Sequence, residues 1–279
     1  MTGALQVVLR QGMWRAAVGA GVLVLALTGC GGQSDAKNKS LSTITERGTL
    51  NVGSCLATPP WGIINSAGNP DGFDVDVAKQ LGEFLGAKVN DTDVSAASRV
   101  PSLQSGKLDV VSCTFTVTPE RQEQVDFSLP VVNTGNSLVT RKGSSIQTVD
   151  DLTGHTVAVN KGGSAIGVTQ AANAKAKLQP YESFADALLA VKQGQADAMI
   201  DTSDAMASAV KKDPSLALAV DGKVGPIKHF ALGVRKDEPE LLAKVNEFVT
   251  KFHAEGTGTE LYRKWFEANP TYQFEGLES

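Results

Sequence analysis

Hydrophobic residues recur along the chain with two different spacings. Between residues 73 and 85 they fall at i, i+4, i+8, i+11 and i+12, which places them on one face of a helix. These residues are Phe73, Val77, Leu81, Phe84 and Leu85. Leu50 and Val52, on either side of a polar residue, and the segment Thr-Val-Ala-Val at residues 156–159 are instead typical of strands. Strands that alternate with helices predict an α/β fold with mostly parallel sheets.

Two segments of the sequence are similar, residues 100–111 and 187–200. Each pattern predicts a short helix that ends at a glycine and leads into a hydrophobic strand. The similarity predicts two α/β lobes of related structure. Ligands of open parallel sheets bind at the carboxyl ends of the strands, so we expect two polar rims to face each other across a cleft. Those ends are residues 54–55, 112–114, 160–162 and 200–202.

Asp74 and Asp76 occupy the first turn of the helix predicted at residues 73–85. Carboxylates at this end of a helix complement the helix dipole, which is the interpretation we favour. A catalytic acid/base pair is the alternative, but positions i and i+2 project to different sides of a helix.

The first 29 residues have the pattern of a signal peptide. Arg10 and Arg15 precede an uncharged run at residues 16–28, which is shorter than the roughly 20 apolar residues of a membrane span. The run ends in Leu-Thr-Gly-Cys at residues 27–30, which resembles a bacterial lipobox and predicts lipid modification of Cys30. A plain signal peptide with a buried cysteine is the alternative. Residues 30–40 are polar and predict a flexible tether.

Composition excludes several functional classes. The chain has 26 Lys and Arg against 30 Asp and Glu, so its net charge is −4 and no basic excess favours nucleic acid. The three histidines and three cysteines are scattered, which argues against a zinc or iron–sulfur site. We therefore expect neither a metal nor a cofactor.

Two short motifs indicate an anion site. Thr118 and Pro119 mark the start of a helix, but Arg121 in its first turn opposes the helix dipole and calls for an anionic ligand or a protein carboxylate. Residues 162–164, Gly-Gly-Ser, lead into a helix predicted at residues 165–176, whose free N–H groups suit an anion. The alternatives are a solvated surface arginine and a glycine turn in which Ser164 caps the helix.

Longer motifs resemble the family 3 extracytoplasmic solute-binding proteins, the amino-acid-capturing components of ABC importers. The matching stretches are residues 72–79, 103–110 and 118–128, with Gly-Thr at 256–257 and Lys-Trp-Phe at 264–266 near the end. The resemblance implies a two-lobed periplasmic-binding-protein fold of type II. Lobe 1 would comprise residues 41–137 and 233–279, and lobe 2 residues 138–232, joined by two crossover segments near residues 136–139 and 230–234.

The resemblance also implies the ligand contacts. Arg121 matches the arginine that binds the ligand α-carboxylate, and Ser164 matches the amide that meets this carboxylate from lobe 2. Thr116 matches a hydroxyl residue near both charged groups, and Thr114 a backbone carbonyl that faces the α-ammonium.

The acid that binds the α-ammonium is ambiguous in this sequence. In the family it lies five residues after the position of Asp197, which is Thr202 here. An aspartate stands one residue earlier, at Asp201, so either the strand end is shifted or another group such as Asp204 takes this role.

Specificity for the side chain of the ligand is expected from the rims. Relatives that bind cationic amino acids stack them on aromatic residues of the first loop, whereas this chain has Thr58 there and Trp61 nearby. Arg99 is similar to an arginine of relatives that bind acidic or amide amino acids, and Lys161 lies at the other rim. Glutamate, aspartate and glutamine are therefore the expected ligands. Cys55, however, stands where some acidic-ligand relatives carry another arginine.

Cys55 and Cys113 end strands that we expect to be neighbours in lobe 1. Their Cα atoms would then fall within the roughly 4.4–6.8 Å of a disulfide, which an exported protein permits. Two buried thiols are the alternative.

The expected function is thus a monomeric, lipid-anchored, extracytoplasmic receptor that delivers an amino acid to a membrane permease. An enzyme on the same fold, such as a cyclohexadienyl dehydratase or a cell-wall lyase, is the alternative, but it needs an acid or base in the cleft. Of His155, His229 and His253, only His229 is a candidate for the rim. A ligand-sensing ectodomain with a separate signalling partner is the third alternative.

Overall fold

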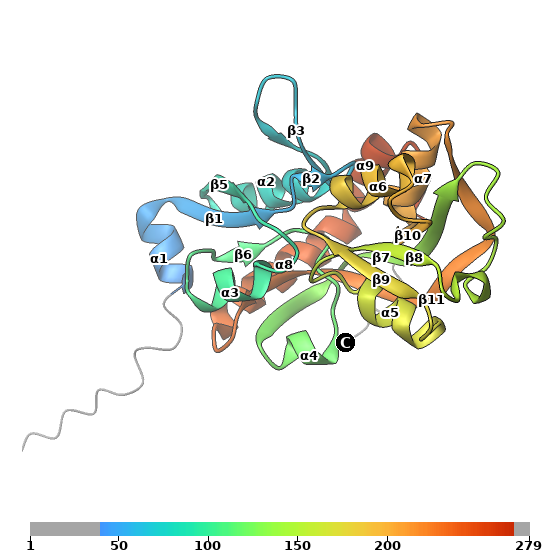
Figure 1. Cartoon of the computed structure of the whole chain (residues 1–279). Helices are drawn as coiled ribbons and strands as arrows, with labels where there is room; N and C mark the ends of the chain where they lie inside the picture. Colours follow the sequence, from blue (N-terminus) through green and yellow to red (C-terminus); the bar gives the residue numbers. More distant parts are fainter. Residues whose placement is uncertain (1–39, 271–279) are drawn as a thin grey trace, which may run out of the picture. The chain divides into compact units, whose positions relative to one another are not determined.

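The computed structural model describes residues 40–270 (Figure 1). The predicted signal peptide, the predicted lipidation site Cys30 and nearly all of the predicted tether lie outside the described residues. Among the described helices, none combines the length and the apolar character that a bilayer crossing requires.

The described part of the chain is built on an eight-stranded sheet with the order β5-β1-β6-β11-β7-β10-β8-β9 (Figure 1). We call β1 (Thr49–Ser54), β5 (Lys88–Asp93) and β6 (Val110–Val111) the first half. The second half comprises β8 (Thr156–Asn160), β9 (Lys177–Tyr181) and β10 (Ala198–Thr202). Strands pair in parallel within each half, as the sequence predicts.

Two long strands join the halves into one sheet. β7 (Val125–Arg141) and β11 (Leu216–Arg235) pair antiparallel with each other and with their outer neighbours β10 and β6. The crossovers expected near residues 136–139 and 230–234 fall within these strands. The lobe boundaries at residues 137/138 and 232/233 therefore stay a prediction. A small separate sheet contains β2 (Ala57–Thr58), β3 (Gly62–Ile64) and β4 (Pro70–Asp71).

Helices accompany both halves. Those of the first half are α1 (Ser40–Arg47), α2 (Phe73–Leu85), α3 (Arg99–Gln104), α4 (Pro119–Gln122), α8 (Pro239–Ala254) and α9 (Thr257–Phe266). Those of the second half are α5 (Ala165–Ala172), α6 (Phe184–Gln193) and α7 (Ser203–Lys212), preceded by the 3₁₀ turn Asp150–Leu152. The predicted apolar face of α2 is confirmed, since Phe73, Val77 and Leu81 are buried in the core.

The repeated helix–glycine–strand pattern is also confirmed. Helix α6 ends at Gly194 with φ of 77°, and α3 is followed by Gly106 with φ of 70°, a conformation that L side chains rarely adopt. β10 and β6 follow directly, so corresponding strand ends of the two halves carry corresponding residues.

Helix α5 ends four residues before its predicted end at residue 176. There the Asn173 side chain donates to the carbonyl of Val149 (2.9 Å), and the chain turns into β9 beside β8. β9 was not predicted, because its Lys, Gln and Pro residues lack a strand pattern and only its position at the sheet edge tolerates them.

Candidate functional site

A small cavity of about 20 Å³ lies where the two halves meet. From the first half and β11 it is lined by Ala96, Arg99, Thr114, Thr116, Lys228 and Phe230. From the second half it is lined by Asn160, Gly163, Ser164, Ala165, Asp201 and Thr202. The structure thus brings together six of the predicted site residues from strand ends that are far apart in the sequence.

Arg121 lies at the edge of this cavity rather than among its lining residues. The Thr118 hydroxyl accepts the backbone N–H of Arg121 (3.4 Å) and caps α4 as predicted. The guanidinium group bends back from this short helix. Its Nη1 donates to the carbonyl of Thr116 (2.7 Å), and its Nη2 donates to the carbonyl of Gly162 in the second half (2.9 Å). Arg121 therefore connects the two halves.

Arg99 is buried, and only 2% of the residue is exposed. Its Nε donates to the carbonyl of Ala96 (2.8 Å). Its Nη1 donates to the carbonyls of Cys113 (2.9 Å) and Thr114 (3.2 Å), and its Nη2 to that of Gly162 (3.1 Å). Four of its five N–H groups are thus used by backbone carbonyls.

The two guanidinium groups converge on a single carbonyl oxygen, that of Gly162. Both also lie over the ring of Phe115, with Cζ 4.8 Å (Arg99) and 5.4 Å (Arg121) from its centroid. The pKa of Arg99 lies well below its usual range, mainly because the group is buried and secondly because Arg121 repels its charge. Burial also lowers the pKa of Arg121. Two desolvated cations therefore share one neutral acceptor.

A second contact between the halves joins two hydroxyl groups. Thr116 Oγ1 and Ser164 Oγ are 3.1 Å apart. Ser164 occupies the N-cap position of α5, but its hydroxyl makes no capping hydrogen bond. The cap expected as an alternative role for Ser164 is thus absent, because its hydroxyl contacts Thr116 instead.

Asp201, the aspartate one residue before the acid position of the family, lines the cavity together with Thr202. Its Oδ1 accepts the backbone N–H of Thr202 (2.6 Å) at the end of β10. Burial raises the pKa of Asp201, and the positive charge of Lys228 acts in the opposite direction. Asp204, the sequence alternative, is engaged elsewhere, since its carboxylate accepts hydroxyl groups of Thr134 and Tyr262.

Lys228 was missed by the sequence reasoning. Its Nζ donates to Asn136 Oδ1 (2.5 Å) and lies 5.2 Å from the centroid of the Phe230 ring. Burial lowers its pKa to about 8, and the charge of Asp201 opposes this shift. The signal was a cation two residues before the crossover predicted at residues 230–234.

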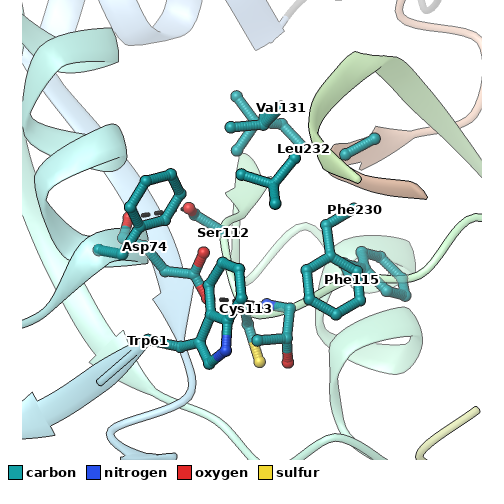
Figure 2. A pocket seen from close by; sticks show the side chains of 12 residues that line it. Trp61, Asp74, Ser112, Cys113, Phe115, Val131, Phe230 and Leu232 are labelled. Carbon is teal, nitrogen blue, oxygen red and sulfur yellow. Dashed lines mark hydrogen bonds between the residues drawn. The ribbon is translucent and has the colours of Figure 1, made fainter. Parts of the chain in front are cut away.

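Trp61 lies in the core of the first half and not at this cavity. It is fully buried, and its ring packs edge-on against Phe73 (5.3 Å between centroids) and Phe230 (5.2 Å). It lines a separate cavity of about 10 Å³, where Figure 2 shows it with Asp74 and Ser112. Trp61 was expected near the ligand because of its place in the first loop, but its aromatic neighbours hold it inside.

Asp74, in the first turn of α2, contacts the strand end that carries Thr114. Its Oδ2 accepts the backbone N–H of Thr114 (2.8 Å), which fixes Thr114 in a conformation with φ of 41°. Its own carbonyl accepts the Ser112 hydroxyl (2.8 Å) (Figure 2). Burial raises the pKa of Asp74 to about 7. This carboxyl group therefore positions a strand end that lines the cavity between the halves.

Lys161 does not line this cavity and forms an exposed ion pair with Glu182 (2.6 Å). Glu182 instead lines a larger cavity of about 130 Å³ between the halves, together with Asp93. This second cavity shares Ala96 and Asn160 with the first. Asp93 Oδ1 accepts the backbone N–H of Leu56 (3.0 Å).

The sequence of residues 50–268 matches the model of a family described as bacterial extracellular solute-binding proteins, family 3. The chain belongs to this family. It is 30% identical over 259 residues to the ABC transporter glutamine-binding protein GlnH of Bacillus subtilis, covering 89% of this chain and 94% of that relative.

Two further relatives of this family 3 protein bear on its function. The L-cystine-binding protein TcyJ of Escherichia coli K12 is 30% identical over 254 residues, covering 90% of this chain and 95% of TcyJ. The solved structure of the ancestral amino acid-binding protein AncCDT-1, described as a precursor of cyclohexadienyl dehydratase, has a TM-score of 0.76 and 34% identity. It covers 81% of this chain and 99% of AncCDT-1.

The family 3 protein has a disulfide between Cys55 and Cys113, with the two Cα atoms 4.9 Å apart. The bond joins the ends of two strands of the first half, and the carbonyl of Cys113 accepts the Arg99 guanidinium. The disulfide therefore links the loop after β1 to residues 113–114, whose carbonyls accept hydrogen bonds from Arg99.

The three histidines lie outside the cavity between the halves. His155 contacts Asp197 (3.2 Å), and His229 contacts Asn133 (2.7 Å). His253 contacts the carbonyl of Pro130 (2.9 Å). Over residues 40–270, no cluster of three His, Cys, Asp or Glu side chains fits a metal ion.

Proposed function

We propose that this family 3 protein captures a polar amino acid between its two halves, with an acidic or amide side chain favoured, and delivers it to the permease of an ABC importer. The glutamine-binding and L-cystine-binding relatives support an amino acid as the ligand. The protein would be an extracytoplasmic monomer, anchored to the membrane through a lipid on Cys30.

The observation that carries this proposal is the convergence of Arg99 and Arg121 on the carbonyl of Gly162. A carbonyl oxygen carries a partial negative charge, whereas a carboxylate carries a full one. Hydrogen bonds between ionised partners are roughly twice as strong as neutral ones. An α-carboxylate would therefore displace Gly162 from at least one guanidinium and relieve the repulsion between the two cations.

The opposite end of the ligand would meet acceptors. The Thr114 carbonyl, the Thr116 hydroxyl and the Asp201 carboxylate line the same cavity. Because burial raises the pKa of Asp201, an ammonium group would stabilise its ionised form. Asp201 is thus the acid we assign to the α-ammonium, with Thr202 beside it.

The energies are sufficient for useful affinity. Hydrogen bonds to charged groups contribute about 1.5–3 kcal/mol each. Four to six of them can outweigh the free-energy cost of closing the two halves and still supply the roughly 8 kcal/mol of micromolar binding. Since the contacts come from both halves, the ligand would favour the closed arrangement through its differential affinity.

An enzyme is the second candidate, because AncCDT-1 is described as a precursor of a dehydratase. A side chain that could exchange a proton in the cavity is Lys228, whose pKa is about 8. A ligand-sensing ectodomain remains the third candidate.

Thermal-shift and calorimetric screening of the twenty amino acids tests the proposal. We expect one amino acid, or a few of similar side chain, to stabilise the protein and to be recovered unchanged. Turnover of a cyclohexadienyl substrate would instead support the enzyme. Failure of all twenty amino acids to bind would refute the proposed function.

A further inference from the structure

Among the described residues, three cationic side chains gather at the cavity between the halves, whereas a single carboxylate lines it. Arg99 and Lys228 line the cavity and Arg121 lies at its edge, whereas Asp201 is the lining carboxylate. Asp93 and Glu182 line the neighbouring cavity and are held by a backbone N–H and a lysine. Asp74 and Asp204 do not line the cavity, although their charges act on Arg99 and Lys228, respectively. Both already have partners, the Thr114 N–H for Asp74 and two hydroxyl groups for Asp204.

An amino acid with a neutral side chain would leave this excess of positive charge unchanged. Its α-carboxylate and α-ammonium cancel, so the cations still outnumber the anions around it. A second carboxylate on the ligand reduces the excess by one charge. In a site withdrawn from water, this difference is worth more than on an exposed surface.

Lys228 is the lining cation with the most unused hydrogen-bonding capacity. An ammonium group has three N–H donors, and the structure uses one of them, for Asn136 Oδ1. Arg99 by contrast has four of its five donors on backbone carbonyls. Burial lowers the pKa of Lys228, and the charges of Asp201 and Asp204 oppose this shift without cancelling it.

We propose that Lys228 makes this protein select amino acids with a carboxylate side chain over the corresponding amides. The inference rests on the proposed function, since it names the substrate class of the same cavity. Asn136 holds the Lys228 ammonium group in position from β7, and the ring of Phe230 lies beside this group on β11, the strand of Lys228 itself. A carboxylate accepts a charge-assisted hydrogen bond from this ammonium group, whereas a carboxamide oxygen is neutral.

Isothermal titration at pH 7 and fixed salt tests this selection with L-glutamate, L-glutamine, L-aspartate, L-asparagine and L-arginine. The wild-type protein should bind one of the two acids about tenfold or more tightly than its amide. In Lys228→Gln the affinity for that acid should fall about tenfold or more, while the affinity for the amide changes less than about threefold.

Lys223→Gln is the matched control, because Lys223 is an exposed lysine on the same strand. It should leave the preference for the acid unchanged. Lys228→Arg keeps the positive charge and should retain the preference, and circular dichroism checks that each variant is folded. The ratio of acid to amide affinity in the wild-type protein provides a test that depends on no substitution.

Two results would overturn the inference. One is a wild-type protein that binds an amide or arginine at least as tightly as it binds the tighter of the two acids. The other is a folded Lys228→Gln variant that keeps the full preference for the acid. Either result would leave the proposed function standing, because an amino acid still binds. Absence of binding by all twenty amino acids would instead refute the proposed function and this inference together.

Discussion

The two halves contribute opposite charges to the cavity between them. The first half supplies two cations, the guanidinium groups of Arg99 and Arg121. The second half supplies acceptors, namely the carbonyl of Gly162 and the carboxylate of Asp201. The hydroxyl pair of Thr116 and Ser164 completes the contact.

The halves also differ in how their cavity residues are anchored. In the first half the disulfide joins two strand ends, and Asp74 holds the backbone of Thr114. In the second half, the cavity is lined by the ends of β8 and β10, by the turn that contains Gly163 and Ser164, and by the first residue of α5. The first half thus holds its two guanidinium groups on a cross-linked segment, and the second half supplies the carbonyl of Gly162 that accepts their hydrogen bonds. A ligand carboxylate would replace this carbonyl.

Removing the donor that connects the halves should have the largest effect. Arg121→Ala is expected to weaken amino-acid binding by about 100-fold or more, because two hydrogen bonds to a charged group are lost. Isothermal titration measures this loss. Arg263→Ala, at an exposed arginine of α9, is the control and should bind normally. An unchanged affinity in folded Arg121→Ala would contradict the assigned role.

Removing the brace of the first half should come next. The double variant Cys55→Ser with Cys113→Ser is expected to lower the free energy of unfolding by about 2–4 kcal/mol, because the reduced chain gains freedom when unfolded. Urea denaturation measures the change. Mass spectrometry after alkylation without reductant provides the control, and modification of both cysteines in the wild-type protein would rule out the disulfide.

The buried carboxyl of the first half should give stability a pH dependence. Burial raises the pKa of Asp74 from 3.8 to about 7, so the folded state binds the proton more tightly than the unfolded chain. Its contribution to stability is complete below pH 4 and is lost as the pH rises through 7. Asp74→Asn does not titrate and still offers an acceptor to the Thr114 N–H.

From pH 5 to pH 8, the free energy of unfolding of the wild type should therefore fall by about 2–3 kcal/mol more than that of Asp74→Asn. Urea denaturation at each pH measures both values. Glu83→Gln, at an exposed position of the same helix, is the control. Parallel pH profiles for the Asp74→Asn and wild-type proteins would show that Asp74 ionises normally.

The smallest effect is expected at the surface of the second half. Lys161→Gln breaks only an exposed ion pair with Glu182, and such pairs contribute about 0–1 kcal/mol to stability. Affinity for the amino acid should change less than about twofold. A tenfold or greater loss of affinity in calorimetry would instead support the ligand contact that the sequence predicts for Lys161.

Much of the fold could be predicted because local patterns determine it. The periodicity of residues 73–85 gave α2, and the helix–glycine–strand repeat gave the two corresponding strand ends. β9 could not be predicted, since its polar residues are tolerated only at the sheet edge. The continuous course of β7 and β11 through both halves depends on pairing between distant segments.

The site was predicted where a motif marks a strand end. Ser164 and Asp201 reach the cavity because they lie at or near such ends. Arg99, which the family resemblance predicted, reaches it from the start of α3. Trp61 and Lys161 do not line it, since aromatic packing holds the first and an ion pair the second. Only three-dimensional packing identifies Lys228, which approaches from β11.

The central claim is that guanidinium groups of the first half bind the α-carboxylate of an amino acid. Calorimetry on the wild-type protein tests it most directly, by comparing the tightest-binding amino acid with its α-carboxamide derivative. Loss of the negative charge at this one group should weaken binding about 100-fold or more. Equal affinity for the acid and its α-carboxamide would contradict the claim.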